Sequence, residues 1–397
     1  GTPAVAQSLY GFTRGLTTPY VQQYNLSIQT RLGKGWILET GYIGSRGNNL
    51  LVEPSLNQAL LVNSSNSVTF SNPLITANGN PGGIKLLQNS NANASLRVPV
   101  PGFSAAGLNL VTNQGYSHYN GFILEATHAF AKSFQFKMDY TFSKSTDNDS
   151  GPSGSDLDSF TGNQLAPALN RGVSDFDQTH RFVFTGVWNL PGPKTGFLGQ
   201  TIGNWGLSGV WTIQSGLPFN ISSTNGGGLA GLNGSALIRA TPGAACSSIK
   251  ASGAADQHIN NYLNASCFAV VPNLPSGTVL NNFNPQQTAG SGTYTIGNSG
   301  VAGDPGVGSL FGGLARNIVR GPAAERFDIA LTKAFPIRKL LGEAGNITFR
   351  AEAFKLFNNP IFSNPQANIS NISTFGHITS TVDGTGRILQ LALKLNF

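Results

Sequence analysis

The sequence predicts an all-β protein that forms a transmembrane antiparallel β-barrel, and three observations lead to this fold class. Charged residues make up only 10 % of the 397 residues, against about 25 % in soluble domains. Nine segments of the chain alternate apolar and polar side chains with a period of two, which is typical of strands with one apolar face. The connections between these segments are alternately short and long, as in outer-membrane barrels.

The composition also excludes other classes of protein. No stretch approaches the roughly 18 consecutive apolar residues of a membrane-spanning helix, so a helical transporter is excluded. The net charge is +7, but no three basic residues are consecutive, so the clustered cations of a nucleic-acid surface are missing. The polar residues are mainly Asn, Ser, Thr, Gln and Gly. We therefore expect a β-rich protein with no nucleic-acid partner.

The predicted strands follow from the alternation, segment by segment. They lie near residues 20–32, 35–46, 119–131, 134–146, 179–190, 203–216, 325–336, 345–358 and 386–397. In the first four, the apolar face carries in order Tyr24, Leu26, Ile28 and Leu32; Trp36, Leu38 and Tyr42; Phe122, Leu124 and Phe130; and Phe134, Phe136, Met138, Tyr140 and Phe142. In the last five it carries Phe182, Phe184, Trp188 and Leu190; Trp205, Leu207, Trp211 and Ile213; Phe327, Ile329, Leu331 and Phe335; Ile347, Phe349 and Ala351; and Leu389, Leu391, Leu393, Leu395 and Phe397.

The lengths of the connections between the predicted strands distinguish a barrel from a soluble β-sandwich. Four of the connections are short, at residues 33–34, 132–133, 191–202 and 337–344, and each is followed by a long one, at residues 47–118, 147–178, 217–324 and 359–385. A sandwich has no reason to place every long loop at one end, and it uses strands of about 5 or 6 residues with charged solvent faces. A tilted membrane strand needs about 9 to 11 residues. The pattern favours the barrel.

The polar faces of the predicted strands carry charges that we expect to face the barrel lumen. These residues are Arg31, Glu39, Glu125, Asp139, Arg181, Arg326, Asp328, Arg350 and Glu352. Opposite charges on neighbouring strands would pair across the sheet. Such pairs either stabilise the wall alone or contact a plug and line a route through the barrel, and the sequence leaves both roles open.

Two loop features suggest further sites. Asp147, Asp149, Asp156 and Asp158 lie in a Gly- and Ser-rich loop, and such oxygen-rich loops can hold calcium, although the EF-hand spacing is absent and a solvated acidic loop is the alternative. Cys246 and Cys267 would form a disulfide in an exported protein and remain ordinary thiols in a cytosolic one.

No catalytic or cofactor motif appears in the sequence. The five histidines are scattered, and His180 in the segment DFDQTHRF would need a serine nearby to act in a hydrolase. We therefore expect no enzyme activity and no cofactor. The chain begins at Gly1 and contains a single methionine, so we expect a mature segment or a piece of a longer protein.

The chain ends with the alternating strand RILQLALKLNF. An apolar strand with a terminal aromatic residue, here Phe397, resembles the signal by which the outer-membrane assembly machinery recognises barrels. The resemblance implies that this strand ends in the periplasm. All the short turns then lie in the periplasm and all the long loops lie outside the cell.

The sequence contains PYVQQYNLSIQTRLGKGWILETGYIGSRG at 19–47, YNGFILEATHAFAKSFQFKMDYTFSKS at 119–145, NRGVSDFDQTHRFVFTGVW at 170–188, RFDIALTKAFPI at 326–337 and RAEAFKLFNNPIFSNPQANI at 350–369. With several shorter stretches, these resemble the barrel region of the Oar-like TonB-dependent outer-membrane transporters. The resemblance implies a barrel of 22 strands, of which residues 1–397 would form a carboxy-terminal fragment of about nine, without the plug and amino-terminal domains.

The same resemblance implies a function and a location. The intact protein would lie in the outer membrane of a Gram-negative-type bacterium, surrounded by lipid, and take up an unidentified extracellular substrate. TonB would supply energy through the missing amino-terminal segment. The 217–324 loop is the predicted ligand contact, because loops on a rigid scaffold carry recognition. A passive porin or adhesion barrel, and a secreted β-sandwich binding module, are the alternatives.

Overall fold

The computed structural model describes most of the strands and part of the loops. The longer described ranges are 7–60, 91–100, 103–131, 133–151, 167–193, 196–223, 259–270, 314–337, 345–382 and 386–396, with short pieces at 68–70, 84–86, 164, 241–242, 246, 248–251, 280–281 and 295–296. No helix in these ranges is long and apolar enough to span a membrane.

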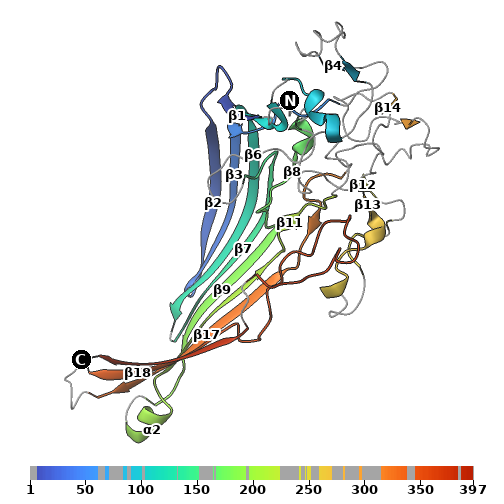
Figure 1. Cartoon of the computed structure of the whole chain (residues 1–397). Helices are drawn as coiled ribbons and strands as arrows, with labels where there is room; N and C mark the ends of the chain where they lie inside the picture. Colours follow the sequence, from blue (N-terminus) through green and yellow to red (C-terminus); the bar gives the residue numbers. More distant parts are fainter. Residues whose placement is uncertain are drawn as a thin grey trace.

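One large sheet dominates the structure (Figure 1). Its nine main strands are β2 (Tyr20–Gly33), β3 (Trp36–Val52), β6 (Phe103–Ala131), β7 (Phe134–Asp147), β9 (His180–Asn189), β10 (Trp205–Gln214), β17 (Ala324–Pro336), β18 (Asn346–Phe354) and β19 (Ile388–Asn396). They are neighbours in the sheet in the same order as in the sequence, and every neighbouring pair is antiparallel. The prediction of an all-β, antiparallel fold is confirmed.

Each predicted segment overlaps one of these strands, but some boundaries were wrong. β6 begins at Phe103 instead of residue 119, because β1 (Gln7–Phe12) pairs in parallel with its first half and β3 continues alongside it to Val52. β18 ends at Phe354 instead of residue 358, because Lys355 adopts a positive φ of 52° and turns the chain. That turn is held by the Lys355 backbone N–H, which donates to Asp328 Oδ1 at 2.9 Å.

The register gives the sheet an apolar face that crosses strand after strand. One row joins Leu26, Tyr42, Phe122 and Phe142 across β2, β3, β6 and β7. These side chains are well exposed, and on the last strand Leu391 is 72 % exposed. Soluble monomers do not expose a continuous apolar surface of this extent. The face therefore needs a covering that the described chain does not supply.

The short and long connections lie at opposite ends of the sheet, and Figure 1 shows α2 (Gly196–Thr201) at one end and most of the small loop elements at the other. Those elements are β4 (Val68–Phe70), β5 (Ile84–Leu86), η1 (Asn91–Leu96), η2 (Pro167–Asn170), β8 (Gly172–Val173), β11 (Pro218–Phe219), β12 (Thr241–Pro242), η5 (Ala265–Cys267), β13 (Phe268–Ala269), β14 (Leu280–Asn281), β15 (Thr295–Ile296) and β16 (Val319–Arg320).

A compact apolar core lies among the long loops. It joins parts of two long connections, and we call the described residues 217–223, 259–270, 314–320 and 362–378 the loop module. Its buried side chains are Phe219, Ile221, Tyr262, Leu263, Cys267, Phe268, Val319, Ile369, Phe375 and Ile378. Leu263 and Val319 are almost completely inaccessible. The long connections are thus partly folded into a packed unit at one end of the sheet.

Candidate functional site

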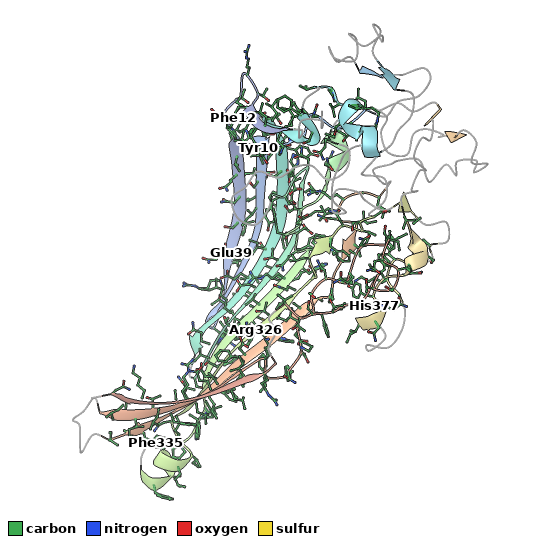
Figure 2. All side chains as sticks on the ribbon, viewed as in Figure 1. Tyr10, Phe12, Glu39, Arg326, Phe335 and His377 are labelled. Carbon is green, nitrogen blue, oxygen red and sulfur yellow. A yellow bond between two sulfur atoms is a disulfide. The ribbon has the colours of Figure 1, made fainter. Side chains whose placement is uncertain are left out.

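The polar face of the sheet carries all nine charged residues that the sequence assigned to the lumen. The strand register places Arg31, Glu39, Glu125, Asp139, Arg181, Arg326, Asp328, Arg350 and Glu352 on the face opposite the apolar rows. Figure 2 shows Glu39 and Arg326 on the sheet and His377 among the loops beside it. The nine residues share a face because strand side chains alternate strictly between the two sides.

Three carboxylates lie in a row across this face. Glu39 is directly opposite Glu125, and Glu125 is directly opposite Asp139. Like charges directly opposite each other destabilise a sheet. Lys137 relieves this repulsion, because its Nζ lies 2.8 Å from Glu125 Oε2 and 3.1 Å from Asp139 Oδ1. Gln29 Nε2 donates to Glu39 Oε2 at 3.3 Å.

Lys137 was missing from the residues that the sequence analysis singled out as lumen charges. The alternation of apolar and polar residues could have identified it, because Lys137 lies between Phe136 and Met138 and therefore on the polar side of β7. The two contacts to Glu125 and Asp139 make it the cation at the centre of the acidic row.

Two further ion pairs lie within single strands. Arg326 Nε is 2.8 Å from Asp328 Oδ2 on β17, and Arg350 Nη2 is 2.6 Å from Glu352 Oε1 on β18. The general expectation of pairing between neighbouring strands was wrong for these two. Residues two apart on a strand project from the same face, and a long arginine side chain spans the distance. Only the Lys137–Glu125 contact among these pairs crosses from one strand to the next.

The polar face is hollowed between β7 and β18. A hollow of about 430 Å³ is lined by Gln135, Phe136, Lys137, Thr185, Gly186, Val187, Ser208, Gly209, Val210, Asp328, Ile329, Ala330, Arg350, Glu352 and Phe354. Amide, hydroxyl, ammonium, guanidinium and carboxylate groups all border this space. It therefore offers both donors and acceptors of hydrogen bonds to a polar solute.

Two arginines of the loop module, Arg316 and Arg320, form ion pairs with aspartates outside it. The Arg316 guanidinium pairs with the Asp147 carboxylate, and both side chains are almost completely buried, with 4 % and 3 % exposed. The Arg320 guanidinium pairs with Asp177, whose side chain is fully buried, while the Arg320 side chain is 28 % exposed. Burial lowers the pKa of Arg316 to about 10, so it stays protonated at neutral pH. Each pair therefore holds a connection to the segment before β17.

The calcium prediction concerns four aspartates in this region. Arg316 supplies the positive charge beside Asp147, and Asp149 accepts a hydrogen bond from the Gly151 backbone N–H at 3.0 Å. Asp156 and Asp158 lie outside the described residues. Within the described part of the chain, no group of three or more His, Cys, Asp or Glu residues could hold a metal. The calcium site stays a prediction.

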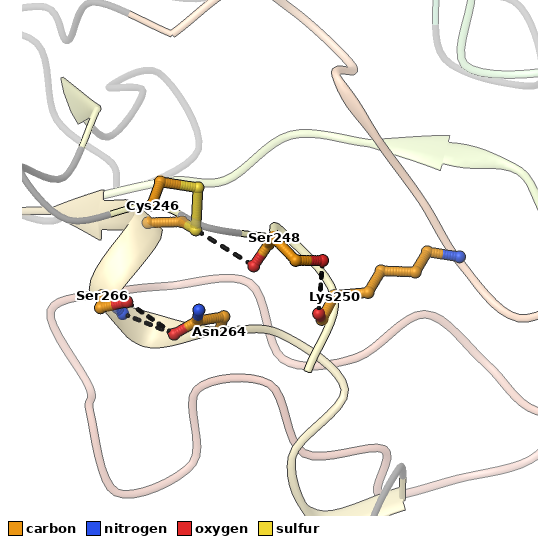
Figure 3. The surroundings of a disulfide bond; sticks show 6 residues. Cys246, Ser248, Lys250, Asn264 and Ser266 are labelled. Carbon is orange, nitrogen blue, oxygen red and sulfur yellow. Dashed lines mark hydrogen bonds between the residues drawn. A yellow bond between two sulfur atoms is a disulfide. The ribbon is translucent and has the colours of Figure 1, made fainter. Parts of the chain in front are cut away.

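Cys246 and Cys267 are joined by a disulfide across 21 residues (Figure 3). Cys267 is buried in the core of the loop module, and its Sγ also contacts the Ser248 carbonyl oxygen at 3.2 Å. Asn264 caps the η5 turn that carries Cys267, because its Oδ1 accepts from the Ser266 backbone N–H at 3.2 Å. The crosslink therefore attaches the exposed Cys246 to the packed module.

The remaining sequence candidates lie elsewhere. The His180 ring lies on the apolar face, where Nδ1 is 2.8 Å from the Tyr140 hydroxyl and the ring centroid is 5.2 Å from that of Phe142. These contacts are those of a packed ring and not of a serine–histidine pair. Phe397, the predicted assembly signal, lies outside the described residues, and β19 ends at Asn396.

Comparison with known families decides the class of protein. A family described as "Outer membrane beta barrel domain" matches residues 1–390. The chain belongs to this outer membrane β-barrel family. The predicted outer-membrane location is therefore confirmed, and lipid is the covering that the apolar face of the sheet requires.

Two solved outer-membrane transporters are similar to this family member. The outer membrane transporter YddB from Escherichia coli has a TM-score of 0.45 and 10 % identity, and the match covers 100 % of this chain and 35 % of YddB. The FrpB iron transporter from Neisseria meningitidis (F3-3 variant) has a TM-score of 0.40 and 11 % identity, and the match covers 97 % of this chain and 32 % of FrpB. The chain thus spans about a third of the length of either transporter. A search of curated proteins gives no match.

Proposed function

We propose that this chain forms part of the wall of a larger TonB-dependent barrel that takes up a substrate across the outer membrane. The observation that carries the proposal is the polar face, where a hollow of about 430 Å³ is bordered by Lys137, Asp328, Arg350 and Glu352. A wall with lipid on its apolar side has its polar side in the lumen. Charged groups of both signs there suit the passage of a polar solute.

The open edges of the sheet support a larger barrel. β2 and β19 are the end strands of the sheet, so each leaves one edge unpaired among the described residues. Unpaired backbone groups at the edge of a sheet in lipid are prohibitively costly, which is why membrane barrels close. With 22 strands, the number implied by the Oar-like resemblance, about thirteen more strands would complete the wall.

The loop module is the proposed contact for the extracellular substrate. It combines parts of the 217–324 and 359–385 connections around one apolar core, and the Cys246–Cys267 disulfide attaches Cys246 to it. Rigid loops at one end of a scaffold carry recognition at a low entropic cost. The Oar-like resemblance adds a plug and TonB as partners in energy coupling. Within this proposal the chain catalyses no reaction.

Growth competition tests the proposal. A strain lacking the full-length gene is compared with the wild type in media where a siderophore-bound metal, a glycan or a peptide is the limiting nutrient. We expect a growth defect in one medium, and the same defect after deletion of tonB. Equal growth in all three media overturns the uptake function, whereas a defect that tonB deletion does not reproduce indicates a passive porin.

A variant pair separates transport from wall stability. Arg350→Met with Glu352→Met removes the ion pair beside the hollow and leaves the net charge unchanged. We expect reduced uptake with an unchanged heat-modifiable band on gels. Leu391→Val on the lipid-facing side of β19 is the control and should leave uptake at the wild-type rate. Equal uptake by the double variant and this control contradicts the route along the polar face.

A further inference from the structure

The β9–β10 connection carries a short helix with an unusual apolar surface. α2 (Gly196–Thr201) and the residue after it expose Phe197 by 79 %, Leu198 by 59 % and Ile202 by 60 %. Local hydrogen bonds hold the turn of α2, because the Ile202 N–H donates to the Leu198 carbonyl at 2.9 Å and the Thr201 hydroxyl donates to the Phe197 carbonyl at 3.0 Å. Three large apolar side chains thus project from this hydrogen-bonded turn.

A buried lysine holds this connection against the sheet. Lys333 lies on the apolar face of β17, in register with Trp205 on β10, and only 1 % of its surface is exposed. Its Nζ donates to the carbonyl oxygens of Thr201, at 3.2 Å, and Gly203. A cation at the carboxy-terminal carbonyls of a helical turn is favourable.

Two aromatic rings complete the site of Lys333. Its Nζ lies 5.2 Å from the ring centroid of Trp205 and 5.2 Å from that of Phe335, within the range of cation–π attraction. A lysine facing lipid directly would be unfavourable. Here the carbonyls and rings enclose the charge, so the connection both covers Lys333 and is fixed by it.

The apolar surface of α2 continues the lipid-facing side of the sheet. Trp188 on β9 and Trp205 on β10 lie on the apolar face of the sheet, next to the connection. Phe335 lies on the same face at the same end of β17 (Figure 2). Trp188 is 40 % exposed and Phe335 is 37 % exposed. Aromatic residues form girdles where barrel surfaces meet the lipid headgroups. α2 therefore extends an apolar surface that already contacts the membrane.

We propose that the β9–β10 connection is a lipid anchor in which Phe197, Leu198 and Ile202 insert among the phospholipids of the leaflet at the short-connection end. Lys333 is the positioning residue that holds α2 in the inserting orientation. Short amphipathic segments bind the boundary between headgroups and acyl chains in this way. The anchor rests on membership of the outer membrane barrel family and does not depend on the transport function.

Quenching of tryptophan fluorescence tests the insertion. The full-length protein with Phe197→Trp is reconstituted in vesicles of brominated phosphatidylcholine, and the emission of the unsubstituted protein is subtracted. Phe12→Trp is the matched control, because Phe12 is 72 % exposed and lies at the opposite end of the sheet (Figure 2). We expect at least twofold stronger lipid quenching for Phe197→Trp than for Phe12→Trp. Equal quenching of the two variants by the lipid, or quenching of Phe197→Trp by aqueous iodide instead, overturns the anchor.

A second variant tests the positioning role of Lys333. Lys333→Met is added to Phe197→Trp, and Lys394→Met, on the polar face of β19, is the control substitution. We expect lipid quenching to fall at least twofold with Lys333→Met and to remain unchanged with Lys394→Met, while both proteins keep the heat-modifiable band of a folded barrel. Unchanged quenching with Lys333→Met contradicts its positioning role.

Discussion

Lys137 Nζ lies 2.8 Å from Glu125 Oε2 across the β6–β7 pair. The same nitrogen is 3.1 Å from Asp139 Oδ1 on its own strand. Because Glu39 is opposite Glu125 and Glu125 is opposite Asp139, one ammonium group balances the centre of a row of three carboxylates. The acidic row is therefore compensated by a cation at its centre.

Replacing Lys137 tests this balance. Lys137→Met leaves the acidic row without its central cation, so we expect the free energy of unfolding to fall by about 1 kcal/mol. Urea unfolding of the full-length protein in vesicles, followed by tryptophan fluorescence, measures the change. Lys394→Met is on the same face but away from the row and should have a smaller effect. A larger fall in the free energy of unfolding with Lys394→Met than with Lys137→Met would contradict the role of Lys137 as the cation of the acidic row.

The buried pair of Arg316 and Asp147 makes a second prediction. Arg316→Met leaves the Asp147 carboxylate buried without its cation, which costs on the order of 3 kcal/mol or more. Because the pair ties Arg316, in the 217–324 connection, to Asp147, the last residue of β7, we expect faster proteinase K cleavage of the 147–178 connection on intact cells. The control is Arg326→Met, whose side chain is 47 % exposed. Cleavage at the same rate in both variants would show that the buried pair does not secure the loop.

The disulfide makes a third prediction, about local stability. Cys246→Ser with Cys267→Ser opens a crosslink of 21 residues, and loops of this size contribute about 3 kcal/mol. We expect amide hydrogen exchange to accelerate in residues 259–270 and to stay unchanged in β9, because the sheet has its own hydrogen bonds. Equal acceleration of amide hydrogen exchange in β9 would contradict a local effect of the disulfide.

The strands were predictable because lipid on one side imposes strict alternation. The segment at 134–146 is an example, and β7 begins and ends within one residue of it. The first half of β6 was not predictable in the same way, since its parallel partner β1 is about a hundred residues distant in sequence. α2 was also missed, because six residues are too few to show a helical period.

The candidate site was predictable in part for the same reason. Alternation alone placed Glu125 and Arg350 on one face, and the structure places them there. It did not identify the partner of each charge. Arg350 pairs within its own strand, and Arg316 meets Asp147 across 169 residues of sequence. Such distant pairs depend on how the long connections fold, which no local pattern records.

The most direct test of the central claim is the orientation of the two sheet faces. Nitroxide labels are attached to cysteines introduced singly at Leu391, Ala392, Leu393 and Lys394 of β19 in the full-length protein in vesicles. The account predicts alternation, with collisions with oxygen dominant at Leu391 and Leu393 and collisions with a water-soluble nickel chelate dominant at Ala392 and Lys394. Accessibility that does not alternate, or that alternates with the opposite phase, would contradict a wall with lipid on its apolar face and a lumen on its polar face.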